Sequence, residues 1–357
     1  MLASTHNGEI RSQMRTAISL TIAAALIFVA GCSAAEPITE DGETQAAQSE
    51  TTETEVAEVC DPAAAHPKGA FGFATQLDDS LPEAWRLEFG VIMANLQEVA
   101  PISPCLHDFR DSETNEYSVK SPMSIYAWSN AVDNPWPEER PGMEGTSISG
   151  DGTNTWMILE IYQDEFEYDD LHRFSVIAHE YWHVYQRGAW MADSPPVGDS
   201  WPVWMWEGGA QVVEELYVSE HYDRSNFDSN LFPVIATGLS NPSDFELYDR
   251  DGGAAGGELD LNTSAFMVLA FAKELQKTQG ISEAQAFRLI LSAPAKPNSA
   301  TPFLDVFGMT SEDFYTSLNQ YPAVESGEDW FEGDVVDASD VMPSRDLTLA
   351  EILAPSE

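Results

Sequence analysis

Basic residues are scarce in this chain of 357 residues. Lys and Arg together number 16 against 60 Asp and Glu, which gives a formal net charge of −44 at pH 7. Such an excess of carboxylates repels nucleic-acid phosphates and anionic lipid headgroups, so we expect neither as a partner through surface charge. It suits a protein that works at high external salt, where ions screen the self-repulsion.

Cysteine is also scarce, with three residues in the whole chain. Cys32 follows Val29-Ala30-Gly31, at the end of an apolar run of fifteen residues, 17–31. A run of this length is too short to span a bilayer, which needs about 20 residues, and is typical of a signal-peptide core. The small residues before Cys32 resemble a bacterial lipobox. We therefore expect residues 1–31 to be removed as a signal peptide, with Met14 as an alternative start, and Cys32 to carry a lipid.

Cys60 and Cys105 are then left as one pair, which we expect to form a disulfide in an exported, oxidising compartment; two free thiols are the alternative. Between lipid and fold, residues 32–59 contain many Thr, Ala, Glu and Gln and no Lys or Arg. This composition predicts a disordered acidic tether. The protein is accordingly expected outside the cytoplasm, as a monomer anchored by its lipid to a bacterial membrane.

After the tether the chain is predicted to form one domain without internal repeats. Its fold class is α+β and mainly helical, with a small sheet. Residues 60–164 form its N-terminal part, 165–324 a helical region and 325–357 an acidic, weakly structured tail. Aromatic and branched residues predict strands at 123–128 and 156–162. Apolar periodicity predicts helices at 81–99 and 170–187. Pro202 marks the start of a helix at 202–222, and further helices are expected at 262–279 and 282–293.

The segment His179-Glu180-Tyr181-Trp182-His183 lies in the predicted helix 170–187. Residues four apart share a helix face, so His179 and His183 can bind one metal ion. Glu180 is turned about 100° round the axis, where it can reach a metal-bound water without binding the metal itself. Asp169 and Asp170 can cap the start of this helix. A solvated helix face with two histidines and a glutamate is the alternative interpretation.

A catalytic zinc site needs a third protein ligand and one open position. Metzincins are excluded, because their motif has Gly three residues and a His or Asp ligand six residues after the second histidine, and positions 186 and 189 here are Gln and Ala. The segment 204–210 instead contains Glu207 followed by Gly208, Gly209 and Ala210, and Pro202 stands at the start of its helix. Paired glycines cost roughly 1 kcal/mol each in a helix, so we expect them to permit a close approach that brings Glu207 to the two histidines.

Other residues of this second helix are alternatives. Glu214, Glu215 and His221 compete with Glu207 as third ligand, although Glu214 lies two turns, about 10 Å, further along the helix. Gln211, one turn from Glu207, is predicted to accept the free N–H of a ligating histidine and fix its ring. A plain interhelical hydrogen bond is the other interpretation of Gln211.

These motifs resemble the gluzincin metallopeptidases, and more narrowly the peptidase MA-like domains, whose second helix contains W-x-x-E-G-x-A. The resemblance covers about residues 165–320, including a helical tail at 263–280, 303–308 and 311–315. It implies a zincin-like metallopeptidase domain with His179, His183 and Glu207 as Zn²⁺ ligands and Glu180 as general base. The chain departs from the pattern in the 23 residues between His183 and Glu207, and in Gly209, where the family has a bulkier apolar residue.

The resemblance further implies hydrolysis of a peptide or protein substrate. The zinc ion would polarise the scissile carbonyl and lower the pKa of its water toward 7, while Glu180 accepts the proton. Tyr217, Tyr222 and Tyr248 are candidates for stabilising the oxyanion. The strand at 156–162 is expected to border the cleft and pair with substrate.

Two other functions remain open: a non-catalytic, zinc-containing surface binding or assembly lipoprotein, and a gluzincin-type aminopeptidase. The segment 141–145 is compared with the G-x-M-E-N element that holds a substrate amino group in such aminopeptidases, but Gly145 stands where that element has Asn. The Gly-rich acidic segment 249–260 is more typical of a surface loop than of a calcium site.

Overall fold

The computed structural model describes residues 71–102, 122–150, 154–190, 201–224, 239, 241–246, 261–293, 300–325 and 334–354. The chain divides into two units, Met1–Asp61 and Pro62–Glu357, and every described residue belongs to the second. The predicted signal peptide, tether, lipidation site at Cys32 and Cys60–Cys105 disulfide all lie outside the described residues. No helix in the described ranges is both long enough and apolar enough to cross a membrane.

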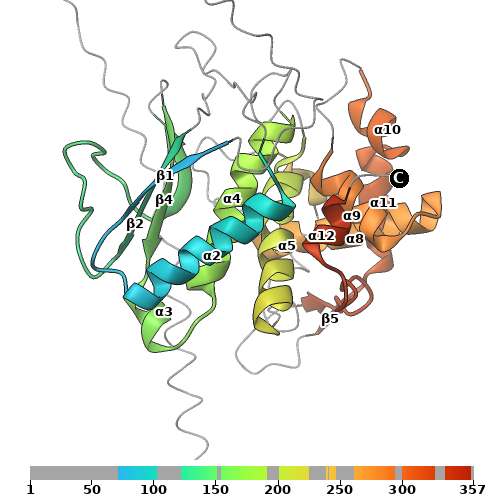
Figure 1. Cartoon of the computed structure of the whole chain (residues 1–357). Coiled ribbons are helices and arrows are strands. Elements are labelled where there is room, and N and C mark those ends of the chain that lie inside the picture. The colour runs from blue at the N-terminus through green and yellow to red at the C-terminus, as the bar shows by residue number, and fades with distance from the viewer. Residues whose placement is uncertain are drawn as a thin grey trace, which may run out of the picture. The chain divides into compact units, whose positions relative to one another are not determined.

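A four-stranded sheet lies beside the helices (Figure 1), in the order β1-β2-β4-β3. The first three strands in this order are parallel, and β3 runs antiparallel to β4. The strands are β1 (Phe73–Leu77), β2 (Met123–Ser129), β3 (Thr146–Gly150) and β4 (Thr155–Ile161). The two predicted strands are confirmed as β2 and β4. However, β4 is an interior strand. The edge strands of this sheet are β1 and β3, so the segment 156–162 is not the edge that the sequence favoured for pairing with substrate.

The two faces of the sheet contribute to different apolar clusters, because successive side chains of a strand point to opposite faces. Ile125 and Met157 belong to the main core, which they share with α2 (Glu83–Val99) and α4 (His172–Trp190). Trp128 and Trp156 face the other side, where a loop before β3 covers them with Trp136 and Met143. With both faces covered, β2 and β4 are almost continuously apolar, which is why they could be predicted.

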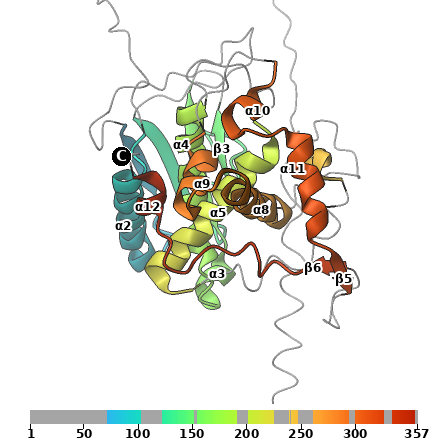
Figure 2. The same cartoon turned by 90° about the vertical axis from the view of Figure 1, so that its right-hand side faces the viewer.

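The helices form the rest of the main core. Helix α5 (Val203–Tyr222) packs against both α4 and α8 (Leu261–Gln279), and α9 (Glu283–Leu291) packs against α8. Figure 2 shows α8 and α9 alongside α5. The five predicted helices are therefore confirmed. Shorter elements are α3 (Gln163–Glu167), η2 (Pro242–Phe245), α10 (Pro302–Phe307), α11 (Ser311–Ser317), η3 (Leu318–Gln320), β5 (Ala323–Glu325), β6 (Asp334–Val336) and α12 (Leu349–Leu353).

The paired glycines of α5 serve two different neighbours. A Cβ atom at Gly208 would lie 2.2 Å from the Ser264 carbonyl oxygen of α8, and one at Gly209 would lie 3.1 Å from Gln186 Nε2 of α4. The expected close packing is confirmed. It was expected to bring α5 to α4 alone, but Gly208 is required by the contact of α5 with α8.

The C-terminal stretch differs from the expected weakly structured tail. Within 334–354, Val336, Val341, Leu349 and Ile352 are buried in the main core. Helix α12 packs against α2, α5 and α9, and Arg288 of α9 donates to the carbonyl oxygen of Ile352 at 2.5 Å. The apolar residues here are too widely spaced to show a period, so the acidic residues between them dominate the sequence pattern.

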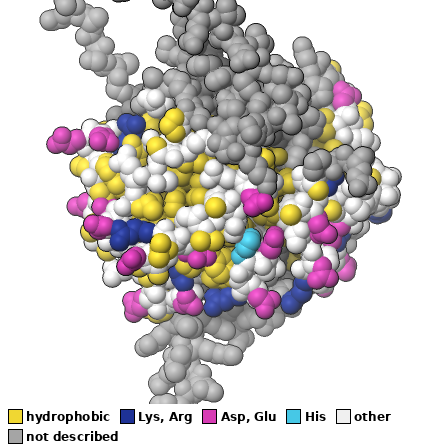
Figure 3. Space-filling model, viewed as in Figure 1, with side chains coloured by type: hydrophobic (Ala, Val, Ile, Leu, Met, Phe, Trp, Pro, Cys, Tyr) yellow, Lys and Arg dark blue, Asp and Glu magenta, His cyan; other side chains and the backbone are white. Residues whose placement is uncertain are grey.

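The surface seen in Figure 3 shows the charge bias of the composition. Acidic side chains lie around the face of the molecule viewed in Figure 1, and hydrophobic side chains occupy much of its middle. Leu87 and Val91, one turn apart on α2, are 68% and 50% exposed.

Candidate metal centre

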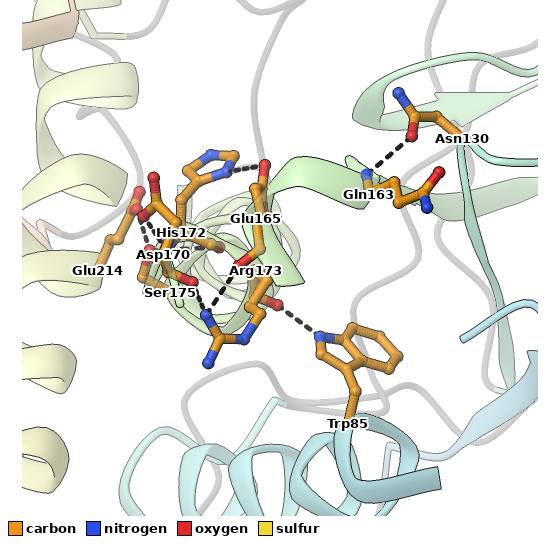
Figure 4. A network of polar contacts seen from close by, with 9 residues as sticks. All are labelled: Trp85, Asn130, Gln163, Glu165, Asp170, His172, Arg173, Ser175 and Glu214. Atoms are coloured by element: carbon orange, nitrogen blue, oxygen red, sulfur yellow. Dashed lines mark hydrogen bonds and ion pairs between the residues drawn. The ribbon is translucent and has the colours of Figure 1, made fainter. Parts of the chain in front are cut away.

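The first turn of α4 is fixed by polar contacts, several of which Figure 4 shows. Asp170 Oδ1 accepts the backbone N–H of His172 at 3.0 Å, which confirms Asp170 as a cap of this helix. Asp169 adopts a positive φ of 53° and pairs with the Arg173 guanidinium instead. Trp85 of α2 donates to the Arg173 carbonyl oxygen at 2.7 Å. The start and rotation of α4, and hence the direction of its histidines, are set by these contacts.

Three side chains converge at the middle of α4, where His179 and His183 of this helix meet Glu207 of α5. His179 Nε2 lies 3.1 Å from His183 Nε2, and the Glu207 Oε2 atom lies 3.7 Å from the former and 3.3 Å from the latter. Ligands at about 2.0–2.1 Å from a tetrahedral metal ion are separated from one another by about 3.3–3.4 Å. The triangle of donor atoms therefore already has the size that a bound metal ion requires.

The alternative third ligands lie elsewhere. In the part of the chain that the structure describes, the group able to hold a metal ion consists of His179, His183 and Glu207. Glu214 contacts the opposite nitrogen of His179, with its Oε2 atom 3.1 Å from Nδ1. His221 is exposed and contacts the ring of Tyr217, with centroids 4.2 Å apart and ring planes tilted by 33°. Glu215 is buried on α5 but does not belong to the group.

The Nδ1 atoms of both histidines are held by side chains that the sequence did not single out for this role. Glu214 accepts from His179 and from the Ser175 hydroxyl, and Gln186 Oε1 lies 2.9 Å from His183 Nδ1. A histidine that donates through Nδ1 presents the lone pair of Nε2, which is the form that binds metal. The predicted role of Gln211 is therefore wrong, because Glu214 and Gln186 occupy both Nδ1 positions.

Glu180 is a buried side chain near the three candidate ligands and is 4% exposed. Its Oε2 atom has no hydrogen-bond partner among the described residues. Burial raises the pKa of Glu180, an effect that the nearby imidazoles of His183 and His179 oppose. A buried acceptor without a partner calls for a donor at that position, so Glu180 can accept a proton or a hydrogen bond from a molecule in the site.

The charges of the centre favour a cation. Burial opposes the charging of His179, but the Glu207 and Glu214 carboxylates outweigh it and raise the pKa of that imidazole to about 10. Burial also disfavours the charged form of Glu207, yet the His183 and His179 imidazoles hold the pKa of this carboxyl well below its usual range. Two imidazole nitrogens and a carboxylate oxygen, surrounded by further carboxylates, are suited to a metal dication.

The tyrosines proposed for the oxyanion do not reach this centre. Tyr217 and Tyr222 lie ten and fifteen residues beyond Glu207 on α5, which at about 1.5 Å per residue is about 15 and 22 Å along the axis. Their hydroxyl groups contact α2 instead, at Asn95 (3.2 Å) and Glu88 (2.7 Å) respectively. Tyr248 and the segment 249–260 lie outside the described residues.

Comparison with known proteins gives no relative: the chain matches no protein-family model, no curated protein and no solved structure. The function of the chain therefore has to be inferred from the motif residues and from the geometry of His179, Glu180, His183 and Glu207.

Proposed function

We propose that this protein is a zinc-dependent peptidase of the gluzincin type. The observation that carries the proposal is the convergence of two histidines and a glutamate beside a buried, unpartnered glutamate. His179, His183 and Glu207 are the proposed ligands, and Glu180 is the proposed general base. The arrangement meets the two needs of metal-assisted hydrolysis, a three-ligand site and a positioned base.

The donor set favours zinc over other common metals. Mg²⁺ and Ca²⁺ prefer sites made of oxygen atoms alone, whereas imidazole nitrogens with one carboxylate are typical of catalytic zinc. When bound, zinc acts as a Lewis acid on a carbonyl and lowers the pKa of water to about 7.

The residues of the chain supply the rest of the proposed mechanism. Glu180 accepts the proton of the attacking water and passes it to the leaving amine. Its burial raises its pKa, which brings a carboxylate closer to the range in which a general base works at neutral pH. Gln186 and Glu214 keep the imidazoles in the tautomer that presents Nε2. Strand β3 pairs with β4 and contacts α4, so it is the described strand best placed for an extended peptide to join.

A non-catalytic metal protein is the main rival. Structural zinc sites usually have four protein ligands, whereas the ligand group of the described residues has three. This difference favours the peptidase. Aminopeptidase activity is not supported by Glu144, the glutamate of the segment 141–145 that was compared with G-x-M-E-N, because this side chain is exposed in the loop before β3.

The proposed location follows from the sequence alone. The apolar run 17–31 and Cys32 favour export and a lipid anchor, so the peptidase is proposed to act outside the cytoplasm on a bacterial membrane. Its substrate would then be a peptide or protein of that compartment.

The test combines two measurements on the purified chain. One equivalent of zinc, with hydrolysis of a casein-type protein that stops on chelation and returns with zinc, is the expected result. One equivalent of zinc without hydrolysis at any salt concentration would favour the non-catalytic rival.

A further inference from the structure

Gln186 lies on α4 three residues beyond His183 and is fully buried. Its Oε1 atom is 2.9 Å from His183 Nδ1, and its Nε2 atom donates to the Trp206 backbone carbonyl at 2.9 Å. A carbonyl oxygen can only accept, so the NH₂ end of the amide must face Trp206 and the oxygen must face His183. His183 must then donate through Nδ1, which leaves the lone pair of Nε2 for the metal.

The same amide connects the two ligand-bearing helices. Trp206 immediately precedes Glu207 on α5, and its ring stacks on His183 with centroids 5.1 Å apart and planes 10° apart. The Gln186–Trp206 hydrogen bond therefore joins the histidine ligand of α4 to the turn of α5 that presents the glutamate ligand. Gly209 leaves room for this bond, because a Cβ atom there would lie 3.1 Å from Gln186 Nε2.

We propose that Gln186 is a positioning residue of the metal centre, which fixes the tautomer of His183 and the register of His183 against Glu207. The proposal rests on the metal site of the proposed function but not on its peptidase activity. His179 is held by a carboxylate, Glu214, whereas His183 is held by a neutral amide. An amide orients the second ring without adding another negative charge to a centre that already contains Glu180, Glu207 and Glu214.

The test compares Zn²⁺ affinity, by competition with a chromogenic chelator, in the wild type, Gln186→Met and Gln186→Glu. Methionine fills a similar volume without hydrogen bonds, so a 10- to 100-fold loss of affinity is expected. Glutamate still accepts the Nδ1 proton and is expected to retain more affinity than methionine. A role in packing alone would be satisfied by methionine, and unchanged affinity in Gln186→Met would overturn the proposal.

A spectroscopic measurement reports the tautomer directly. In the zinc-loaded wild type, ¹⁵N-edited NMR should show Nδ1–H signals from both His179 and His183. In Gln186→Met the His183 signal should shift or exchange away while the His179 signal persists. Two unchanged signals would contradict the proposal.

Further variants guard against a general effect on folding. Gly209→Ala, which crowds the Gln186 amide, should lower Zn²⁺ affinity without loss of the fold, and affinity at the wild-type level would count against the proposal. Gln279→Leu removes a comparable hydrogen bond, which the Gln279 amide donates to the Phe307 carbonyl oxygen far from the centre along the chain, and should keep wild-type affinity. A wild type that binds no zinc would overturn the proposed function and this inference together. A wild type that binds zinc with Gln186→Met unchanged would overturn this inference alone.

Discussion

Replacing Gly208 with alanine tests the packing that places Glu207. The added Cβ atom would lie 2.2 Å from the oxygen and 2.4 Å from the carbon of the Ser264 carbonyl group. Both are backbone atoms, which cannot rotate away, so α5 and α8 must separate. Overpacking of this kind costs roughly 1–3 kcal/mol, and a backbone contact favours about 3 kcal/mol. The better helix propensity of alanine returns about 1 kcal/mol.

The expected net loss of unfolding free energy is therefore about 2 kcal/mol, or about 4–8 °C in the thermal midpoint of a domain of this size. Gly209→Ala is the matched control, because it gains the same propensity but meets a side-chain amide, Gln186 Nε2, at 3.1 Å, which has to shift by only a few tenths of an ångström. Calorimetry of both metal-free variants should show a lower midpoint for Gly208→Ala alone. A midpoint of Gly208→Ala at or above the wild-type value would refute the argument, and so would equal losses in both variants.

Three more predictions concern the ligands, the charge and the cysteines. Glu207→Ala should weaken Zn²⁺ binding more than Glu214→Ala does. Because Glu214 only orients His179, its removal should lower Zn²⁺ affinity by about 10- to 100-fold. Chelator competition that ranks the two variants in the opposite order would transfer the ligand role to Glu214. Because the net charge of −44 favours an expanded chain, the thermal midpoint should rise between about 0.1 M and 1 M NaCl, where the screening length falls from about 10 to 3 Å; a midpoint that is flat or falls would argue against self-repulsion. Cys32→Ala should abolish lipidation, while Cys60 and Cys105 should resist alkylation until they are reduced; a disulfide that includes Cys32, found by non-reducing mass mapping, would contradict the lipoprotein assignment.

Local patterns were sufficient for the helices and for the interior strands. Helix α4 shows an apolar period, α5 and α8 are apolar around most of their circumference, and β2 and β4 are apolar on both faces. Strands β1 and β3 could not be predicted, because FATQL and TSISG are too polar to stand out. They become strands because the apolar strands beside them supply hydrogen-bond partners. A single sequence does not show such pairings.

The candidate metal centre, too, could be predicted only in part. The positions of His179 and His183 as candidate ligands follow from helical spacing, and that of Glu207 follows from its motif. Glu214 was judged by its distance from Glu207 along α5, but it meets His179 through the packing of α5 on α4, which spacing does not reveal. The contact of Gln186 with His183 could have been predicted from the sequence, because residues three apart lie on the same face of a helix.

The role of Glu180 as general base of a zinc peptidase is best tested by measuring zinc content and turnover together in Glu180→Gln. The amide preserves the shape of a buried side chain that binds no metal in this account, so the variant should still hold one equivalent of zinc. Loss of the general base should lower the rate of casein hydrolysis by about 10²–10⁴-fold. Near-normal hydrolysis by the zinc-loaded variant would show that Glu180 is not the base and would contradict the account.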